Sequence, residues 1–139
     1  MIICATGHRT IITEGRTLLR HFLDLNATNI TYAIGGMAMG WDSVFSRFAL
    51  QYKIPLHCYV PYKGQKPTDE YYDRILEKAS NIIYCSENYT KDCFLKRDRM
   101  MVDASDICLA CCDPSRIKSG TAYTMNYAQK QGLIVLNCW

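Results

Sequence analysis

The segment ITYAIGGMAMGWDSVFSRFALQYKIPLHCYV (residues 30–60) decides the fold. Short apolar runs rich in β-branched residues lie at its two ends, in residues 30–35 and 54–60. Between them, apolar side chains recur at helical spacing over residues 41–53, and Pro55 prevents the helix from continuing. Runs that are apolar throughout are typical of strands buried on both faces of a parallel sheet. The segment therefore predicts a strand, a helix and a second strand parallel to the first.

The same alternation extends along the whole chain. Four more apolar runs predict strands, at residues 2–6, 81–86, 106–112 and 133–138. Helices are expected around residues 18–23, over residues 69–80, over the segment with Arg97 and Arg99, and from Ser119 onward. We expect one Rossmann-like α/β domain over residues 1–139, with a mainly parallel sheet, right-handed crossovers and helices on both faces.

The composition is typical of an ordinary globular protein. Hydrophobic residues make up 49% of the 139 residues, and the formal net charge is +3. Lys and Arg form no evident stripe, so a small anionic ligand is expected as the partner rather than nucleic acid. The start MIICATGHRT lacks the features of a signal peptide, and no apolar run approaches the ~20 residues of a membrane span. We expect a cytoplasmic protein without a membrane partner.

The eight cysteines predict buried free thiols rather than a disulfide scaffold, because most of them lie in or beside apolar runs. Cys108 and Cys111 form a C-x-x-C pattern, but on a strand these two side chains point to opposite faces of the sheet. The sequence offers no second pair and no histidine cluster that would complete a zinc site. Neither a metal nor a cofactor is expected.

In parallel sheets of this kind, ligands bind outside the carboxyl ends of the strands. The first such junction is ATGHRT, where Thr6 ends the predicted strand, Gly7 allows a tight turn, and His8 and Arg9 can reach an anion. The alternative is that Gly7 only turns the chain and that the two basic side chains are solvated.

The second junction is AIGGMAMGWD, whose paired glycines let the backbone approach a ligand. Gly40 opens a helix whose free N–H groups favour negative charge. The glycine spacing is not G-x-G-x-x-G and predicts no dinucleotide fingerprint. Asp42 is either a functional carboxylate or only a first-turn residue that suits the helix dipole. The ligand-binding residues expected here are Gly35, Gly36, Met37 and Gly40.

Two further junctions carry candidates for holding a phosphate. In LKRDRMMVDASDICLA, Arg97 lies on a helix before the fifth strand, although alternating charges also form solvated helix faces. Ser119, Gly120 and Thr121 begin the last helix and offer backbone donors with two hydroxyls, which hold a phosphate or form an ordinary N-cap. We expect Arg97 and this SGT turn to share one phosphate.

Pro61 and Tyr62 follow the third strand in VPYKGQKP. Tyr62 either stacks on a base or is an ordinary loop aromatic. Each junction is a weak signal when taken alone, but all of them are expected at the same edge of one sheet.

The motifs TGHR, GGMAMGWD, RDRMMVDASDICLA and SGTAYTMNYA, in this order and spacing, resemble the SLOG superfamily in its YspA/YpsA-like branch, over essentially the whole chain. The resemblance implies a Rossmann-like sheet that binds nucleotides or nucleotide-derived ligands, and homodimers that pair through helices. It also implies a relation to DprA-like proteins and to the Lonely Guy phosphoribohydrolases, which release a base from a nucleoside monophosphate.

The chain departs from the phosphoribohydrolase pattern at two positions. Arg97 matches the arginine of that pattern, but Asp98 stands where the lysine would be and Thr124 where the glutamate would be. Gly120 and Thr121 match its Gly-Thr pair. Cleavage of an N-glycoside passes through an oxocarbenium-like state that a carboxylate stabilises, and a threonine cannot do this.

The sequence therefore predicts a protein that binds a nucleotide-derived metabolite or signal, and the resemblance implies a role in sensing or in conflict between phage and host. The alternative is an N-glycoside hydrolase acting on a nucleoside monophosphate. In that alternative Arg97 serves in catalysis, and Asp42, Asp98 or Glu14 supplies the missing carboxylate.

Overall fold

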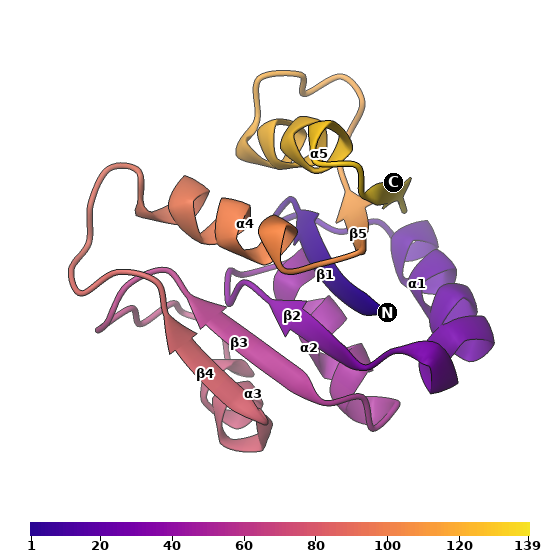
Figure 1. The fold of residues 1–139 in the computed structure, drawn as a ribbon, viewed down its shortest axis with the longest axis horizontal. Helices are drawn as coiled ribbons and strands as arrows, with labels where there is room; N and C mark the ends of the chain where they lie inside the picture. Colours follow the sequence, from indigo (N-terminus) through magenta and orange to yellow (C-terminus); the bar gives the residue numbers. More distant parts are fainter.

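The computed structural model describes residues 1–139, and its six strands form one sheet (Figure 1). All neighbouring strands are parallel, in the order β4-β3-β2-β1-β5-β6. The strands are β1 (Ile2–Gly7), β2 (Tyr32–Gly35), β3 (Leu56–Val60), β4 (Asn81–Tyr84), β5 (Ile107–Cys111) and β6 (Ile134–Asn137). The predicted α/β fold is confirmed, and each strand ends within two residues of its predicted bounds.

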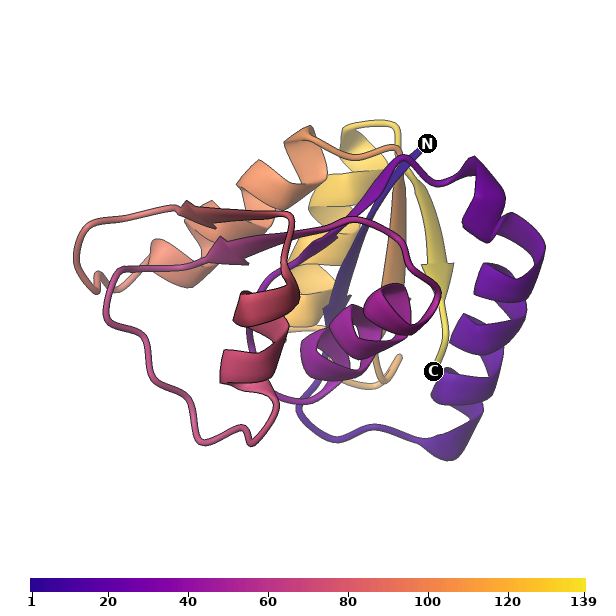
Figure 2. The same cartoon turned by 90° about the horizontal axis from the view of Figure 1, so that it is seen from below.

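Helices cover both faces of the sheet, as Figures 1 and 2 show. The helices are α1 (Thr13–Asn26), the 3₁₀ turn η1 (Ala27–Asn29), α2 (Trp41–Gln51), α3 (Tyr72–Lys78), α4 (Cys93–Asp103) and α5 (Gly120–Lys130). In Figure 2, α2 and α3 lie on the near side of the sheet, and α4 and α5 lie together on the far side. None of these helices combines the length and the apolar character needed to cross a membrane.

Two helices are shorter than the sequence predicts. α2 ends at Gln51 because the chain turns at Lys53, which has a φ of 59°, before Pro55. α3 begins only at Tyr72, since the carboxylate of Asp69 first accepts a hydrogen bond from the backbone N–H of Tyr71 at 2.8 Å. Such local side-chain bonds compete with the helix for the backbone.

The core lies in two layers, one on each face of the sheet. The larger cluster, around Trp41 and Phe45, packs under α1, α2 and α3, and the smaller one packs under α4 and α5. Cys111 belongs to the first cluster and Cys108 to the second, as the alternation of side chains along a strand requires. All eight cysteines are free and buried, and burial raises the pKa of the Cys58 thiol to about 12.

The strand order reverses direction at one point, between β1 and β5. The chain moves outward from β1 to β2, β3 and β4, and then returns past β1 to form β5 and β6. The loops that follow β1 and β5 therefore leave neighbouring strands toward opposite faces of the sheet. In open α/β sheets this position forms the crevice in which ligands bind.

Candidate functional site

Gly7 ends β1 and packs directly against α2. A Cβ atom at this position would lie 2.4 Å from the Cβ of Trp41. The buried indole of Trp41 is fixed in turn, because its Nε1 donates to the carbonyl of Leu109 in β5 at 3.0 Å. The missing side chain at Gly7 is thus required for the packing of the core.

The residues around Gly7 differ in exposure. Thr6 and His8 are buried, and the Nε2 atom of His8 accepts a hydrogen bond from the backbone N–H of Asp113 at 3.0 Å. Burial and the charge of Arg116 lower the pKa of His8, so its imidazole is neutral at pH 7. His8 therefore joins the loop after β1 to the loop after β5, whereas Arg9 is exposed.

The backbone after β2 passes closely over α2 and α4. A Cβ atom at Gly36 would lie 2.7 Å from Oδ2 of Asp42 and 3.3 Å from Cδ of Arg97, and Gly35 has as little room against α2. Met37 is buried and has a φ of 62°, a conformation that residues other than glycine rarely adopt. Side chains larger than hydrogen at the paired glycines would push this segment away from the two charged residues.

Gly40 precedes α2 and has a φ of 80°. A Cβ atom here would lie 2.4 Å from the Cα of Arg9 and 2.6 Å from the carbonyl oxygen of His8. That carbonyl accepts the N–H of Trp41 at 3.1 Å. The loop after β1 thus supplies an acceptor for the first turn of α2, which leaves less of this helix terminus for an anion than the sequence suggests.

A buried charge cluster lies directly below the β2 loop. The Nε atom of Arg97 donates to Asp98 at 2.7 Å, and its Nη1 atom donates to the carbonyl of Gly36. Asp42 accepts the N–H of Ala38 at 3.2 Å. Arg97 and Asp42 are 4% and 5% exposed, so Arg97 is engaged inside the protein instead of extending into solvent toward a phosphate.

One guanidinium group faces two carboxylates in this cluster. Burial raises the pKa of Asp42 from 3.8 to about 6, and Asp98 adds to this rise, while the positive charge of Arg97 opposes it. The pKa of Arg97 is raised by Asp98 and Asp42, although burial alone would lower it. Arg97 therefore stays charged, and Asp42 changes its protonation near pH 6.

The two positions that depart from the phosphoribohydrolase pattern contact each other. The hydroxyl of Thr124 lies 3.1 Å from Oδ2 of Asp98 and 3.0 Å from the carbonyl oxygen of Gly120. Thr124 is buried between α4 and α5. A threonine at this position keeps Asp98 hydrogen-bonded, whereas a glutamate there would face a second carboxylate.

The SGT turn has the geometry of an N-cap. The Ser119 hydroxyl accepts the N–H of Ala122 at 3.1 Å and donates to the carbonyl of Arg116 at 2.9 Å. Thr121 is buried, while Gly120 faces open space. A cavity of about 400 Å³ beside the turn is lined by residues 115–119, and Arg97 is not among its lining residues. The turn is linked to Arg97 through Thr124, whose hydroxyl contacts both the Gly120 carbonyl and Asp98. A phosphate shared by Arg97 and the turn stays a prediction.

A second cavity lies at the carboxyl edge of β1, β2 and β3. It measures about 360 Å³, and we call it the edge cavity. Arg9 and Lys66 bring positive charge to it, and Tyr62 and Phe94 bring aromatic rings. Pro61, predicted with Tyr62, is buried instead. The full lining comprises Arg9, Ala38, Met39, Tyr62, Gln65, Lys66, Pro67, Thr68 and Phe94.

The aromatic side of the edge cavity continues into a small cluster. The rings of Tyr62, Tyr89 and Phe94 lie edge to face, with centroids 5.5 to 6.3 Å apart. The guanidinium carbon of Arg97 lies 5.8 Å from the centroid of the Phe94 ring. The buried charge cluster therefore supports the same ring that lines the cavity.

Sequence reasoning identified Arg9 and Tyr62 in this cavity but missed Lys66, Phe94 and Met39. Lys66 could have been found from the sequence, because it lies in the same loop after β3 as Tyr62. Phe94 gave none, because it comes from the first turn of α4, and only the packing of α4 across the sheet brings it to the edge.

Comparisons with known proteins show that solved structures share this fold. No family model and no curated protein matches the sequence. DNA processing protein A from Helicobacter pylori, a protein that binds single-stranded DNA, superimposes with a TM-score of 0.74 at 19% identity, over 97% of this chain and 63% of that one. DNA processing protein A from Streptococcus pneumoniae gives 0.76 at 16%, over 96% of this chain and 48% of that one. The chain shares their fold.

The molybdenum cofactor carrier protein from Chlamydomonas reinhardtii is also similar, with a TM-score of 0.64 at 16% identity, over 96% of this chain and 73% of that one. The fold expected from the SLOG resemblance is thus confirmed, while the YspA/YpsA-like branch stays a prediction. The chain spans only about half to two thirds of the length of the two DNA processing proteins. At these identities the likeness concerns the fold alone.

Proposed function

We propose that the chain binds a nucleotide or a nucleotide-derived ligand in the edge cavity. The observation that carries this proposal is the pairing of aromatic rings with unpaired positive charge in one cavity, at the carboxyl edge of a parallel sheet. Tyr62 and Phe94 offer ring surface to a base, and Arg9 and Lys66 offer charge to a phosphate. Neither cation forms an ion pair within the chain.

In this proposal the charge cluster holds the cavity in shape. Arg97 fixes the carbonyl of Gly36 and Asp42 fixes the N–H of Ala38, so the loop that contributes Ala38 and Met39 to the lining is held at two points. Removing Arg97 would leave buried carboxylates without their partner, which costs about 3–5 kcal/mol of stability. Arg97→Ala is therefore a poor probe of ligand binding, and Arg9 is the better one.

Calorimetry with nucleoside mono-, di- and triphosphates tests the proposal, after mass spectrometry of any ligand that copurifies. Arg9→Ala should weaken binding by about 1.5 to 3 kcal/mol, the range for hydrogen bonds to charged groups. Tyr62→Ala should weaken it as well. Lys130→Ala, at the far end of α5, removes one positive charge as Arg9→Ala does, and it serves as the control. Binding that is absent, or that Arg9→Ala and Tyr62→Ala leave unchanged, contradicts the proposal.

Single-stranded DNA belongs in the same experiment, because one of the proteins that share the fold binds it. The proposal predicts that an oligonucleotide competes weakly with the small nucleotide, since the cavity of about 360 Å³ suits a single ligand of nucleotide size. An oligonucleotide that binds much more tightly than any mononucleotide would replace the small ligand in this proposal.

Asp42 favours hydrolysis of an N-glycoside as the second candidate function. Its carboxyl is buried and has a pKa near 6, and it bonds to Ala38 in the lining of the edge cavity. Perturbed carboxylates of this kind are common in active sites. Release of free base from a nucleoside monophosphate, lost in Asp42→Asn while ligand binding persists, would establish this activity. No release above background by the wild type would leave the binding function.

A further inference from the structure

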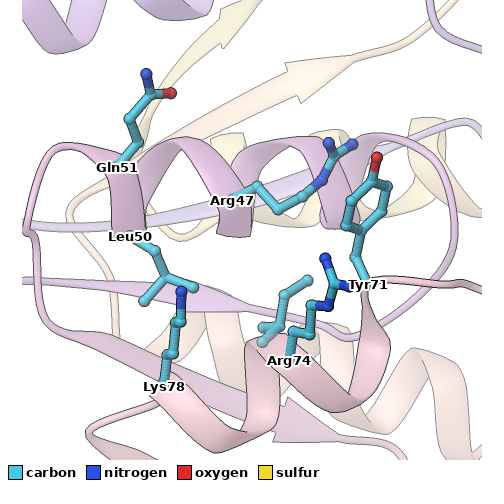
Figure 3. Close-up of a pocket in the computed structure, with 7 residues that line it drawn as sticks. Arg47, Leu50, Gln51, Tyr71, Arg74 and Lys78 are labelled. Carbon is cyan, nitrogen blue, oxygen red and sulfur yellow. The ribbon is translucent and has the colours of Figure 1, made fainter.

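A groove lies between α2 and α3, on the face of the sheet opposite α4 and α5 (Figure 3). Its volume is about 340 Å³. Facing turns of the two helices build it, because residues 47, 50 and 51 share one face of α2 and residues 71, 74, 75 and 78 share one face of the segment around α3. The lining consists of Arg47, Leu50, Gln51, Tyr71, Arg74, Ile75 and Lys78.

Three cations meet in this groove, and none of them has a carboxylate partner. Arg47, Arg74 and Lys78 take part in no ion pair, since the two pairs of the chain are elsewhere. Figure 3 shows Arg74 extending toward Arg47 and Lys78 extending toward Leu50. Like charges that line one groove repel one another, and an anion with several negative charges would relieve this repulsion.

One of the three cations is already held in place. The guanidinium carbon of Arg47 lies 3.8 Å from the centroid of the Tyr71 ring, and its Nε atom donates to the carbonyl of Ser43 at 3.3 Å. No hydrogen bond engages its two Nη atoms. A stacked guanidinium with free Nη groups presents a preorganised fork to phosphate oxygens. Leu50 and the buried Ile75 form an apolar floor between the cations.

We propose that this groove is a second anion site, which binds a ligand carrying two or more linked phosphate groups. The site is separate from the edge cavity, and its residues belong to different elements. A neighbouring cavity, which shares Met39 and Thr68 with the edge cavity, also shares Arg47 and Tyr71 with the groove. It adds one cation, Arg16, and the two carboxylates of Asp69 and Glu70. Those carboxylates would repel a nucleic-acid backbone that ran along the surface, which favours a compact oligophosphate such as the tail of a nucleoside triphosphate.

Titration of inorganic tripolyphosphate into the whole chain by calorimetry tests the proposal, because this probe contains the phosphates alone. Wild-type protein should bind it, and the double variant Arg74→Gln/Lys78→Gln should bind it more than tenfold more weakly. Both side chains are exposed, so the variant should fold, and a thermal melt checks this. Lys130→Gln combined with Lys53→Gln removes the same charge elsewhere and should change the affinity less than twofold.

Arg9→Ala separates this site from the edge cavity. Tripolyphosphate binding that survives Arg9→Ala and is lost in the groove variant supports the proposal, whatever becomes of the nucleotide function. Absence of tripolyphosphate binding by the wild type overturns it. A loss of affinity that is equal in the groove variant and in the charge control also overturns it, as does a loss of affinity in Arg9→Ala alone. Binding of a single-stranded oligonucleotide in the groove, without any binding of tripolyphosphate, overturns it too.

Discussion

At the scale of single residues, burial and the charges around Arg97 determine the protonation of Asp42. One guanidinium group faces the buried carboxyl of Asp42 and the partly buried carboxylate of Asp98, and burial raises the pKa of Asp42. In the folded protein Asp42 keeps its proton up to about pH 6, whereas its ordinary pKa is 3.8. Between these two values the folded state binds more protons than the unfolded state.

This difference predicts how stability depends on pH. The contribution of Asp42 to the free energy of unfolding should fall by about 3 kcal/mol in all as the pH rises from below 3 to above 7, with about 2 kcal/mol of this fall between pH 4 and pH 6. In Asp42→Asn, which does not titrate, this fall should be missing. Urea unfolding of both proteins at several pH values measures it, with Asp73→Asn on the exposed side of α3 as the control. An unchanged difference between wild type and Asp42→Asn from pH 4 to pH 7 would contradict the raised pKa.

Residue types at the right junctions were predictable from the sequence, but burial was not. Thr6, His8 and Arg97 all lie at the carboxyl edge or beside it, as the order of strands predicts, yet all three are buried, and His8 and Arg97 are hydrogen-bonded within the protein. A motif shows that a side chain is near an edge. Whether it points at a ligand or at another loop depends on contacts across the sheet, such as the bond from Asp113 to His8.

At the scale of elements, apolar runs predicted all six strands, and hydrophobic periodicity predicted α1 and α2, because each of these two helices is apolar on the face that it buries. The 3₁₀ turn η1 was not predicted. The ends were less certain, since local bonds such as that of Asp69 to the N–H of Tyr71 set them. Phe94 could not be assigned to the site for a related reason. Its position depends on the angle at which α4 crosses the strands, and the order of apolar residues along α4 does not determine that angle.

The start of α5 allows its role as a cap to be separated from a role in binding. Ser119→Ala removes the cap on Ala122 and should lower the free energy of unfolding by about 1 kcal/mol. Gly120 has no positive φ and faces open space, so Gly120→Ala should leave stability unchanged or raise it by up to about 1 kcal/mol. Chemical denaturation gives both values.

Because Gly120 has no positive φ and faces open space, a side chain at this position should not strain the turn. A folded Gly120→Val variant is therefore a clean test for a phosphate at the SGT turn, because any loss of nucleotide affinity would come from the blocked approach of the ligand. If Gly120→Ala were clearly destabilised, the described geometry of this turn would be wrong.

At the scale of the whole molecule, the sheet has two open edges, formed by β4 and β6. Four inner strands are almost fully buried, whereas β6 exposes Ile134 and Leu136, at 59% and 40% of their surfaces. An outer strand with apolar side chains and free backbone groups readily pairs with another strand. β4 also exposes Ile82 and Tyr84, at 36% and 48%, so either edge strand could contact a second copy of the chain, and β6 carries the more exposed aliphatic residues.

The homodimer that the SLOG resemblance implies stays a prediction, and the structure suggests where to test it. If two copies pair through β6, Leu136→Lys should lower the dimer fraction at micromolar concentration, because it places a charge on the shared apolar edge. Light scattering across a dilution series measures the mass. Leu25→Lys, at an exposed position near the end of α1, is the matched control and should leave the mass unchanged. A monomeric wild type would contradict the dimer itself. A dimer that persists in Leu136→Lys but separates in Leu25→Lys would place the interface at α1 instead of β6. That outcome would agree with the pairing through helices that the resemblance implies.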